Sequence, residues 1–145
     1  MRINKISSCA HYIDAAVNIG VIASQRNDVL LVDAGIDDSV ARKAKRILEE
    51  SGFKLRGIII THAHADHYGG AAHLAKTTGA QVCASAAEKS VLEYPLWEPV
   101  YLFGGAYPPS PLRSKFFLAP RVGVDRTIAP GTIVLPGFEE LVMEV

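Results

Sequence analysis

The stretch that decides the fold of this chain is Thr61-His62-Ala63-His64-Ala65-Asp66-His67-Tyr68-Gly69-Gly70. Three histidines and one aspartate fall within six consecutive positions of it, and the apolar run Ile58-Ile59-Ile60 comes directly before. An uninterrupted apolar run of this kind is typical of a strand that is buried on both faces. The polar cluster is therefore predicted to lie in a loop at the carboxyl end of a central strand, where open α/β sheets place their binding sites.

Imidazole and carboxylate groups at this density form a ligand set suited to zinc, with iron and manganese as alternatives. His62 and His64 stand two positions apart and can turn the same way to bind one ion. Asp66 and His67 are adjacent and are predicted to point away from that pair, where they would bind a second ion. Two ions roughly 3.5–4 Å apart can share a bridging hydroxide and stabilise a displacement reaction from both sides. The spacing predicts one or two metal ions in this loop.

The segments on either side of the loop alternate between predicted strands and predicted helices. Apolar runs predict strands at residues 3–6, 17–24, 29–32 and 81–84, the middle two joined as a hairpin by four polar residues. Helical spacing of apolar residues predicts helices at 37–51, 68–78 and 86–93. Short β-segments at 127–128, 132–135 and 140–145 predict a terminal meander. The expected fold is a single α/β domain, residues 1–145, in which an α+β mixed sheet has helices on one face.

The composition limits the classes of partner. Lys and Arg balance Asp and Glu at 15 each, so we expect no general attraction to nucleic acid or to an anionic membrane. No apolar run approaches the ~20 residues that span a bilayer, and residues 1–20 lack the apolar core of a secretion signal. Cys9 and Cys83 form no C-x-x-C pair. The chain is therefore expected to be cytoplasmic, with reduced thiols.

The pattern His62-x-His64-x-Asp66-His67 resembles the metal motif (HxHxDH) of the metallo-β-lactamase superfamily, and Leu31-Val32-Asp33-Ala34-Gly35 resembles its earlier Asp-x-Gly strand end. The resemblance extends from residue 17 to about residue 84. It implies that His62 and His64 bind the first metal ion, whereas Asp66 and His67 bind the second. It also implies that Asp33 is a structural acid that braces the metal loop.

The same resemblance implies a metal-dependent hydrolase, in which a metal-activated hydroxide attacks an ester, thioester, amide or phosphoester bond of a small-molecule substrate. Asp66 would orient this nucleophile as well as bind metal. The neutral charge argues against a metallo-nuclease, and the flavin-dependent oxygen chemistry found elsewhere in the superfamily would need a flavin domain that the sequence does not offer. The alternative from another class is a metal-binding or assembly module without turnover.

The superfamily builds an αββα sandwich from two similar halves, and this chain resembles the N-terminal half alone. The C-terminal half supplies the remaining metal ligands, whereas here no histidine follows His73. The carboxylates after the loop stand in no recognisable ligand context; they are Glu88, Glu93, Glu98, Asp125, Glu139, Glu140 and Glu144. We therefore expect a truncated chain that is weakly active or inactive alone. We also expect a homodimer that forms through the uncovered face of the sheet.

Aromatic and proline residues gather between residues 94 and 117. The aromatic residues are Tyr94, Trp97, Tyr101, Phe103, Tyr107, Phe116 and Phe117, and the prolines are Pro95, Pro99, Pro108, Pro109 and Pro111. Because proline at this density prevents long regular elements, a shaped loop or a broken helix is expected. The segment either forms a wall of the substrate pocket or seals the domain as a satellite hydrophobic cluster.

Overall fold

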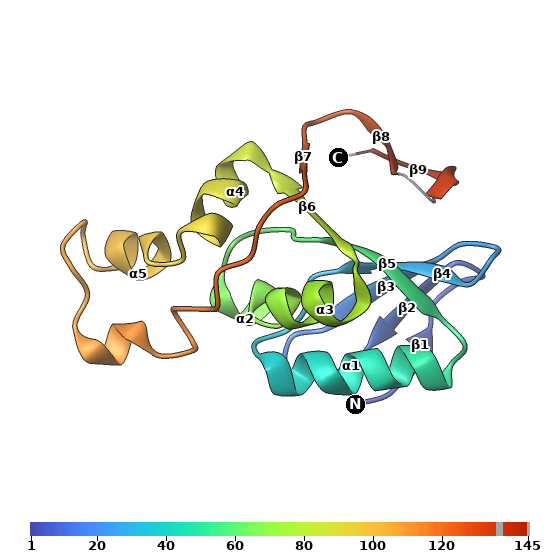
Figure 1. Ribbon diagram of the computed structural model, residues 1–145, viewed down its shortest axis with the longest axis horizontal. Helices are drawn as coiled ribbons and strands as arrows, with labels where there is room; N and C mark the ends of the chain where they lie inside the picture. The colour runs from blue at the N-terminus through green and yellow to red at the C-terminus, as the bar shows by residue number, and fades with distance from the viewer. Residues whose placement is uncertain (136–137, 145) are drawn as a thin grey trace.

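The computed structural model describes residues 1–135 and 138–144 of the chain. Within these residues, the centre is a seven-stranded sheet with the strand order β1-β2-β3-β4-β5-β6-β7 (Figure 1). The strands are Ile3–Lys5 (β1), Ala10–Ile13 (β2), Ile19–Ala23 (β3), Asp28–Val32 (β4), Lys54–Ile59 (β5), Gln81–Ser85 (β6) and Arg126–Ile128 (β7). β1 to β4 pair antiparallel, whereas β4 to β7 run parallel. The predicted α/β class with a mixed sheet is confirmed.

The predicted hairpin is confirmed as β3 and β4, in which Ile22 lies opposite Leu30. β2 is an element that the residue pattern does not predict, because His11 and Tyr12 interrupt its apolar character. Its pairing with β3, which sets Ile13 opposite Ile19, holds it in the sheet. Tertiary pairing thus overrides a weak local preference at this position.

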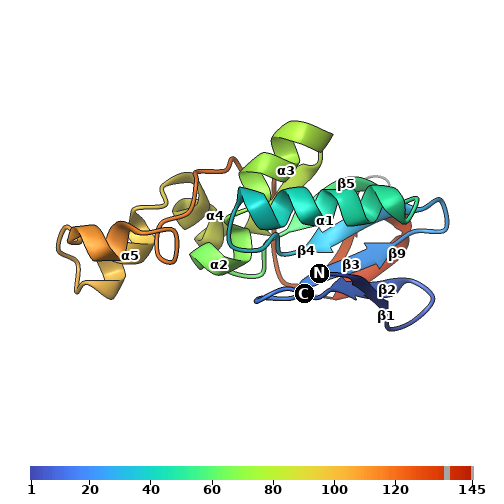
Figure 2. The same cartoon turned by 90° about the horizontal axis from the view of Figure 1, so that it is seen from below.

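Helices α1 (Asp38–Glu50) and α3 (Ala71–Thr78) lie side by side on one face of the sheet (Figure 2). Asp37 caps α1, because its carboxylate accepts hydrogen bonds from the main-chain N–H groups of Ser39 and Val40 at 3.0 Å each. Gly79 ends α3 at φ +74°, a left-handed conformation that glycine adopts without strain. The apolar sides of both helices join the sheet in one core that includes Leu31, Ala44, Leu48, Ile58, Leu74 and Val82.

The other face of the sheet carries a second, smaller core. Leu30, Cys83 and Ile128 are buried there together with Phe138. Phe138 begins β9 (Phe138–Glu144), which pairs antiparallel with β8 (Thr132–Leu135) in a separate two-stranded sheet.

The predicted terminal meander is therefore wrong in its first part. β7 joins the main sheet, where Ile128 lies opposite Ser85 of β6, and among the described residues only β8 and β9 form a hairpin. Burial of Ile128 against the sheet explains why β7 pairs with β6 rather than with β8. The predicted turn at Pro136-Gly137 and the predicted strand end at Val145 lie outside the described residues.

The segment that follows β5 packs main chain against main chain on the segment that follows β4. Gly70 donates its N–H to the carbonyl of Gly35 at 2.9 Å, and Ala34 donates its N–H to the carbonyl of His67 at 2.7 Å. A Cβ atom at Gly69 would lie 2.0 Å from the carbonyl oxygen of Ile36, so only glycine allows this approach. The Gly69-Gly70 pair thus holds the two strand-end segments together.

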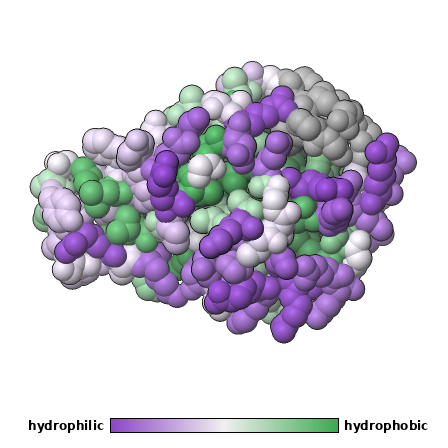
Figure 3. Space-filling model, viewed as in Figure 1, coloured by the Kyte–Doolittle hydropathy of each residue, from purple (hydrophilic) through white to green (hydrophobic). Residues whose placement is uncertain are grey.

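Helices α4 (Ala86–Glu93) and α5 (Trp97–Leu102) and the 3₁₀ turn Ser110–Arg113 lead into an extension at one end of the sheet (Figure 1). We call residues 94–117 the aromatic lobe. Its helical parts are short, α5 and the 3₁₀ turn, in agreement with the shaped loop or broken helix expected for this segment. Its exposed large apolar side chains are Tyr94, Leu96, Trp97, Tyr101, Leu102, Phe103, Tyr107 and Phe116, and hydrophobic surface is visible over it in Figure 3. Lys115 of the lobe pairs with Asp37 at 2.7 Å, which ties it to the start of α1 and lowers the pKa of Asp37.

None of the helices in the described part of the chain is both long and apolar enough to cross a bilayer.

Candidate metal site

The ligand-rich loop, residues 61–67, lies at the carboxyl edge of the parallel part of the sheet. β4 and β5 are parallel neighbours with Val32 opposite Ile59, so the residues that follow the two strands meet at one edge. Asp33 follows β4, and the ligand loop follows β5. The helix predicted at 68–78 is divided in two, because a single helical turn, α2 (Ala65–Tyr68), precedes Gly69-Gly70 and α3 follows them.

Three imidazole rings lie together in this loop. The centroid of the His62 ring is 4.7 Å from that of His64 and 4.0 Å from that of His67. The prediction that His67 points away from the His62–His64 pair is wrong, because the turn of α2 carries His67 back to His62. Asp66 is more open: its side chain is 43% exposed, and its carboxylate lies 4.0 Å from Nε2 of His67.

Each imidazole has one nitrogen engaged by a side chain that is not a candidate ligand. Nδ1 of His67 lies 2.7 Å from the carboxylate of Asp33, Nδ1 of His62 lies 3.0 Å from the hydroxyl of Thr61, and Nε2 of His64 lies 3.0 Å from the hydroxyl of Tyr101. Nε2 of His62, Nδ1 of His64 and Nε2 of His67 have no hydrogen-bond partner among the described residues. A histidine that binds a metal usually holds its second nitrogen in this way, which fixes the ring and its tautomer.

Asp33 is the centre of this hydrogen-bond network. It is only 6% exposed and adopts φ +66°, a left-handed conformation that aspartate tolerates better than most residues. Its carboxylate accepts from the main-chain N–H of Thr61 at 2.9 Å and from the Thr61 hydroxyl. Because that hydroxyl donates to Asp33, its oxygen can accept from Nδ1–H of His62. Asp33 thus contacts His67 directly and His62 through Thr61.

Burial and the neighbouring imidazoles of His67 and His64 lower the pKa of His62. The neutral form that these contacts favour is the form in which imidazole binds a metal ion.

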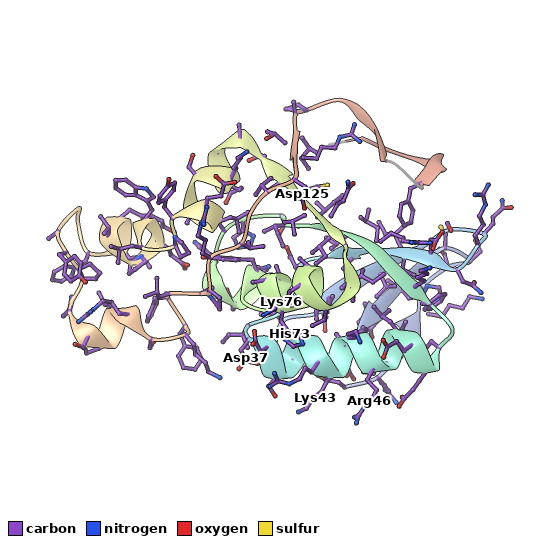
Figure 4. The ribbon with its side chains drawn as sticks, in the orientation of Figure 1. Asp37, Lys43, Arg46, His73, Lys76 and Asp125 are labelled. Atoms are coloured by element: carbon purple, nitrogen blue, oxygen red, sulfur yellow. The ribbon has the colours of Figure 1, made fainter. Side chains whose placement is uncertain are left out.

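The donor types fit a first-row metal, whereas the side chains are not arranged as a finished coordination shell. No group of three or more His, Cys, Asp or Glu side chains in residues 1–135 and 138–144 converges closely enough to hold an ion. The structure therefore brings His62, His64 and His67 together and leaves Asp66 at the edge of the group. His73, by contrast, lies on α3 beside α1 (Figure 4). Its Nδ1 lies 3.7 Å from a carboxylate oxygen of Asp38.

Two carboxylates that the sequence does not connect to the loop reach its main chain. Glu88 of α4 accepts a hydrogen bond from the N–H of Ala63, and Glu98 of α5 accepts one from the N–H of Ala65 at 3.0 Å. They are 25 and 33 residues from their partners. Their sequence surroundings carry no recognisable signal of this role.

Glu98 stands out among the charged side chains because it is buried. It is only 3% exposed, and burial raises the pKa of its carboxyl group to about 7. The hydrogen bond from Ala65 opposes this shift, and the nearby Asp66 adds to it. Burial, together with the charge of Glu98, also raises the pKa of the Tyr68 hydroxyl, which has no hydrogen-bond partner among the described residues.

A hollow of about 310 Å³ lies against the loop. Its polar side is formed by His64, Asp66 and Glu98, and its apolar side by Leu102, Phe116 and Phe117. The aromatic lobe thus borders the candidate site, as expected of a pocket wall.

Comparison with known protein families gives one match that extends over most of the chain. The family model of the metallo-beta-lactamase superfamily matches residues 13–142.

Curated relatives match over a shorter region. A hydroxyacylglutathione hydrolase of Methylobacillus flagellatus is 42% identical over 65 residues, which is 45% of this chain and 24% of that protein. A metal-dependent hydrolase of Thermodesulfovibrio yellowstonii is 38% identical over 64 residues, which is 44% of this chain and 24% of the relative. The matched part therefore spans about a quarter of the length of these relatives.

Solved structures match over nearly the whole chain. BJP-1, a subclass B3 metallo-beta-lactamase of Bradyrhizobium japonicum, superposes with a TM-score of 0.73 at 26% identity and covers 93% of this chain. A metallo-beta-lactamase of Cronobacter sakazakii gives a TM-score of 0.72 at 26% identity and covers 94%. The chain spans 48% and 51% of these two structures, respectively.

Proposed function

Because this chain belongs to the metallo-beta-lactamase superfamily, we propose that its ligand loop is the metal site of a metal-dependent hydrolase. His62, His64, Asp66 and His67 are the proposed ligands of one or two zinc ions. The observation that supports this proposal is that the three imidazoles share one hydrogen-bonding pattern. Each is held at one nitrogen by Asp33, Thr61 or Tyr101, and its other nitrogen has no hydrogen-bond partner in the described part of the chain.

A zinc ion bound there would supply a Lewis acid and lower the pKa of a water molecule. The protein residues orient the metal ligands and the attacking water, and they fix which nitrogen of each imidazole carries the proton. Asp33 accepts a hydrogen bond from Nδ1–H of His67 and thereby keeps Nε2 of that ring free to donate its lone pair to a metal ion. Asp66 lies at the exposed edge of the site, and its proposed role is to orient the attacking water as well as to bind metal.

The proposed substrate is a small molecule with an ester, thioester, amide or phosphoester bond. The name of one curated relative, hydroxyacylglutathione hydrolase, supports an acyl bond for this chain, and the name of the other, metal-dependent hydrolase, supports hydrolysis that needs a metal ion. The hollow beside His64 and Asp66 gives such a molecule room at the loop.

Hydrolysis of a model S-acyl thioester by the zinc-loaded chain tests this function. Because the chain is expected to be weakly active at most, we expect slow turnover that depends on zinc and that is lost on chelation and in the His62→Ala variant. Binding of zinc without any such turnover, across ester, thioester, amide and phosphoester substrates, would reject hydrolysis by this chain.

The alternative function is a metal-binding or assembly module without turnover, and it predicts zinc binding without hydrolysis. One observation favours this alternative: no group of three candidate donors converges among the residues that the structure describes. Two ligands for each ion would leave both sites open and weak.

We also propose that the chain forms a homodimer through the face of the sheet opposite α1 and α3. Ile22 and Ile59 on that face are only partly buried and pack against the small core around Phe138. A second copy would cover them, with sheet packed against sheet around a two-fold axis. Sedimentation at micromolar concentration is expected to give the mass of a dimer, twice 15.6 kDa. A well-folded monomer that does not associate would contradict this proposal.

We propose a cytoplasmic location because neither cysteine forms a disulfide among the described residues. Cys9 is exposed and Cys83 is buried, and both are free thiols.

A further inference from the structure

The segment after β6 contacts three consecutive residues of the ligand loop. Glu88 accepts from the N–H of Ala63, the hydroxyl of Tyr101 lies 3.0 Å from Nε2 of His64, and Glu98 accepts from the N–H of Ala65. The loop is therefore held from two sides. Asp33 holds it from the side of β4, whereas α4 and α5 hold it from the side of the aromatic lobe.

Glu98 makes the most deeply buried of these contacts. Its neighbours on α5, Trp97 and Tyr101, are 56% and 51% exposed, whereas Glu98 is 3% exposed. A carboxylate is buried at a cost in free energy unless it receives hydrogen bonds. Among the described residues, the N–H of Ala65 is the only hydrogen-bond donor to this carboxylate.

That N–H belongs to the first residue of α2. The helix begins without a side-chain cap of its own, because His64 occupies the N-cap position and its side chain accepts no main-chain hydrogen bond there. The carboxylate of Glu98 takes the place of this missing cap from a different helix. Ala65 is fully buried, so its N–H has no access to water as a substitute partner.

We propose that Glu98 is a positioning residue of the metal site, an inference that rests on the proposed metal-binding function. Ala65 stands between two candidate ligands, His64 and Asp66, so the main-chain direction at Ala65 sets where both side chains project. Glu98 fixes that direction through the hydrogen bond to Ala65. Glu98 acts through the position of its acceptor oxygen, which the length of the side chain sets, rather than through its negative charge.

Two conservative substitutions separate reach from charge. Glu98→Gln keeps the length of the side chain and a carbonyl oxygen that accepts from Ala65, but it removes the charge. Glu98→Asp keeps the charge and withdraws the acceptor by one methylene group. If Glu98 acts by position, zinc affinity falls in Glu98→Asp by about 10–100-fold, the usual effect of losing a residue that orients a metal ligand. In Glu98→Gln it stays within about threefold of wild type, because the hydrogen bond is kept.

The experiment titrates zinc into the wild-type chain and both variants by calorimetry, and it records the visible absorption spectrum of each protein with cobalt(II) in place of zinc. The spectrum reports ligand geometry independently of activity. The matched control is the pair Glu93→Gln and Glu93→Asp, because Glu93 also accepts a main-chain N–H, that of Val124, at the end of α4. We expect the Glu93 variants to bind zinc as the wild type does, with an unchanged cobalt spectrum.

The possible outcomes are distinct. Weak binding and an altered cobalt spectrum in Glu98→Asp alone support the proposal. Equal affinity and spectrum in Glu98→Asp and wild type overturn it, even if the variant unfolds at a lower temperature, since Glu98 would then serve stability only. A loss in Glu98→Gln as large as that in Glu98→Asp also overturns it, because the negative charge would then matter as well as the length of the side chain. A wild-type chain that binds no zinc would reject the proposed function itself.

Discussion

Replacing Asp33 by alanine is expected to destabilise the protein and weaken zinc binding together. The variant removes the acceptor from two partly buried hydrogen bonds, which the main-chain N–H of Thr61 and Nδ1–H of His67 donate. Each polar group that is left unsatisfied on burial costs about 1–3 kcal/mol, so we expect the free energy of unfolding to fall by about 2–5 kcal/mol. Zinc affinity should fall by about 10–100-fold, because His67 loses its orientation directly and His62 loses it through Thr61. Urea denaturation and calorimetric titration measure the two effects.

The control for this prediction is Asp33→Asn. Asparagine also tolerates φ +66°, and its carbonyl oxygen can still accept from Thr61, whereas its amide group cannot match the carboxylate at both Thr61 and His67. We expect losses in stability and affinity that are smaller than those of Asp33→Ala. If Asp33→Ala unfolds at the same urea concentration as the wild type and binds zinc equally well, Asp33 does not brace the loop.

Much of the fold could be predicted because local patterns and tertiary contacts agree along the centre of the chain. Apolar runs mark β3, β4 and β6, and the caps Asp37 and Gly79 bound α1 and α3 as their residue types predict. The pattern does not predict β2 and misplaces β7, because their positions depend on pairing with β3 and β6. The residue pattern of a short polar strand does not predict which distant segment it pairs with.

The candidate site could be predicted only in part, for a similar reason. The four candidate ligands lie within six consecutive positions, so the sequence motif alone identifies them. The groups that hold their main chain come from α4 and α5, and a glutamate such as Glu98 looks like any surface residue until the fold buries it. The position of His67 beside His62 also depends on the turn of α2, which the apolar pattern merges with the following helix.

Replacing His62 by alanine is expected to have the largest effect on the metal site. The ring of His62 lies nearest to both other imidazoles, so its removal takes a candidate ligand from the middle of the group. Losing a ligand outright should weaken zinc binding by more than about 100-fold, beyond the effect of losing an orienting partner. The free energy of unfolding of the metal-free protein should change little, because the His62 side chain is only partly buried. The matched control is His73→Ala, since His73 lies on α3 by Asp38 and outside the ligand loop.

The most direct measurement is therefore a calorimetric titration of zinc into three proteins at neutral pH: wild type, His62→Ala and His73→Ala. If the ligand loop is the metal site, wild type and His73→Ala bind zinc with the same affinity and stoichiometry, and His62→Ala binds at least about 100-fold more weakly. Equal zinc affinity in wild type and His62→Ala, or no zinc binding by the folded wild-type chain, would contradict a metal site in this loop.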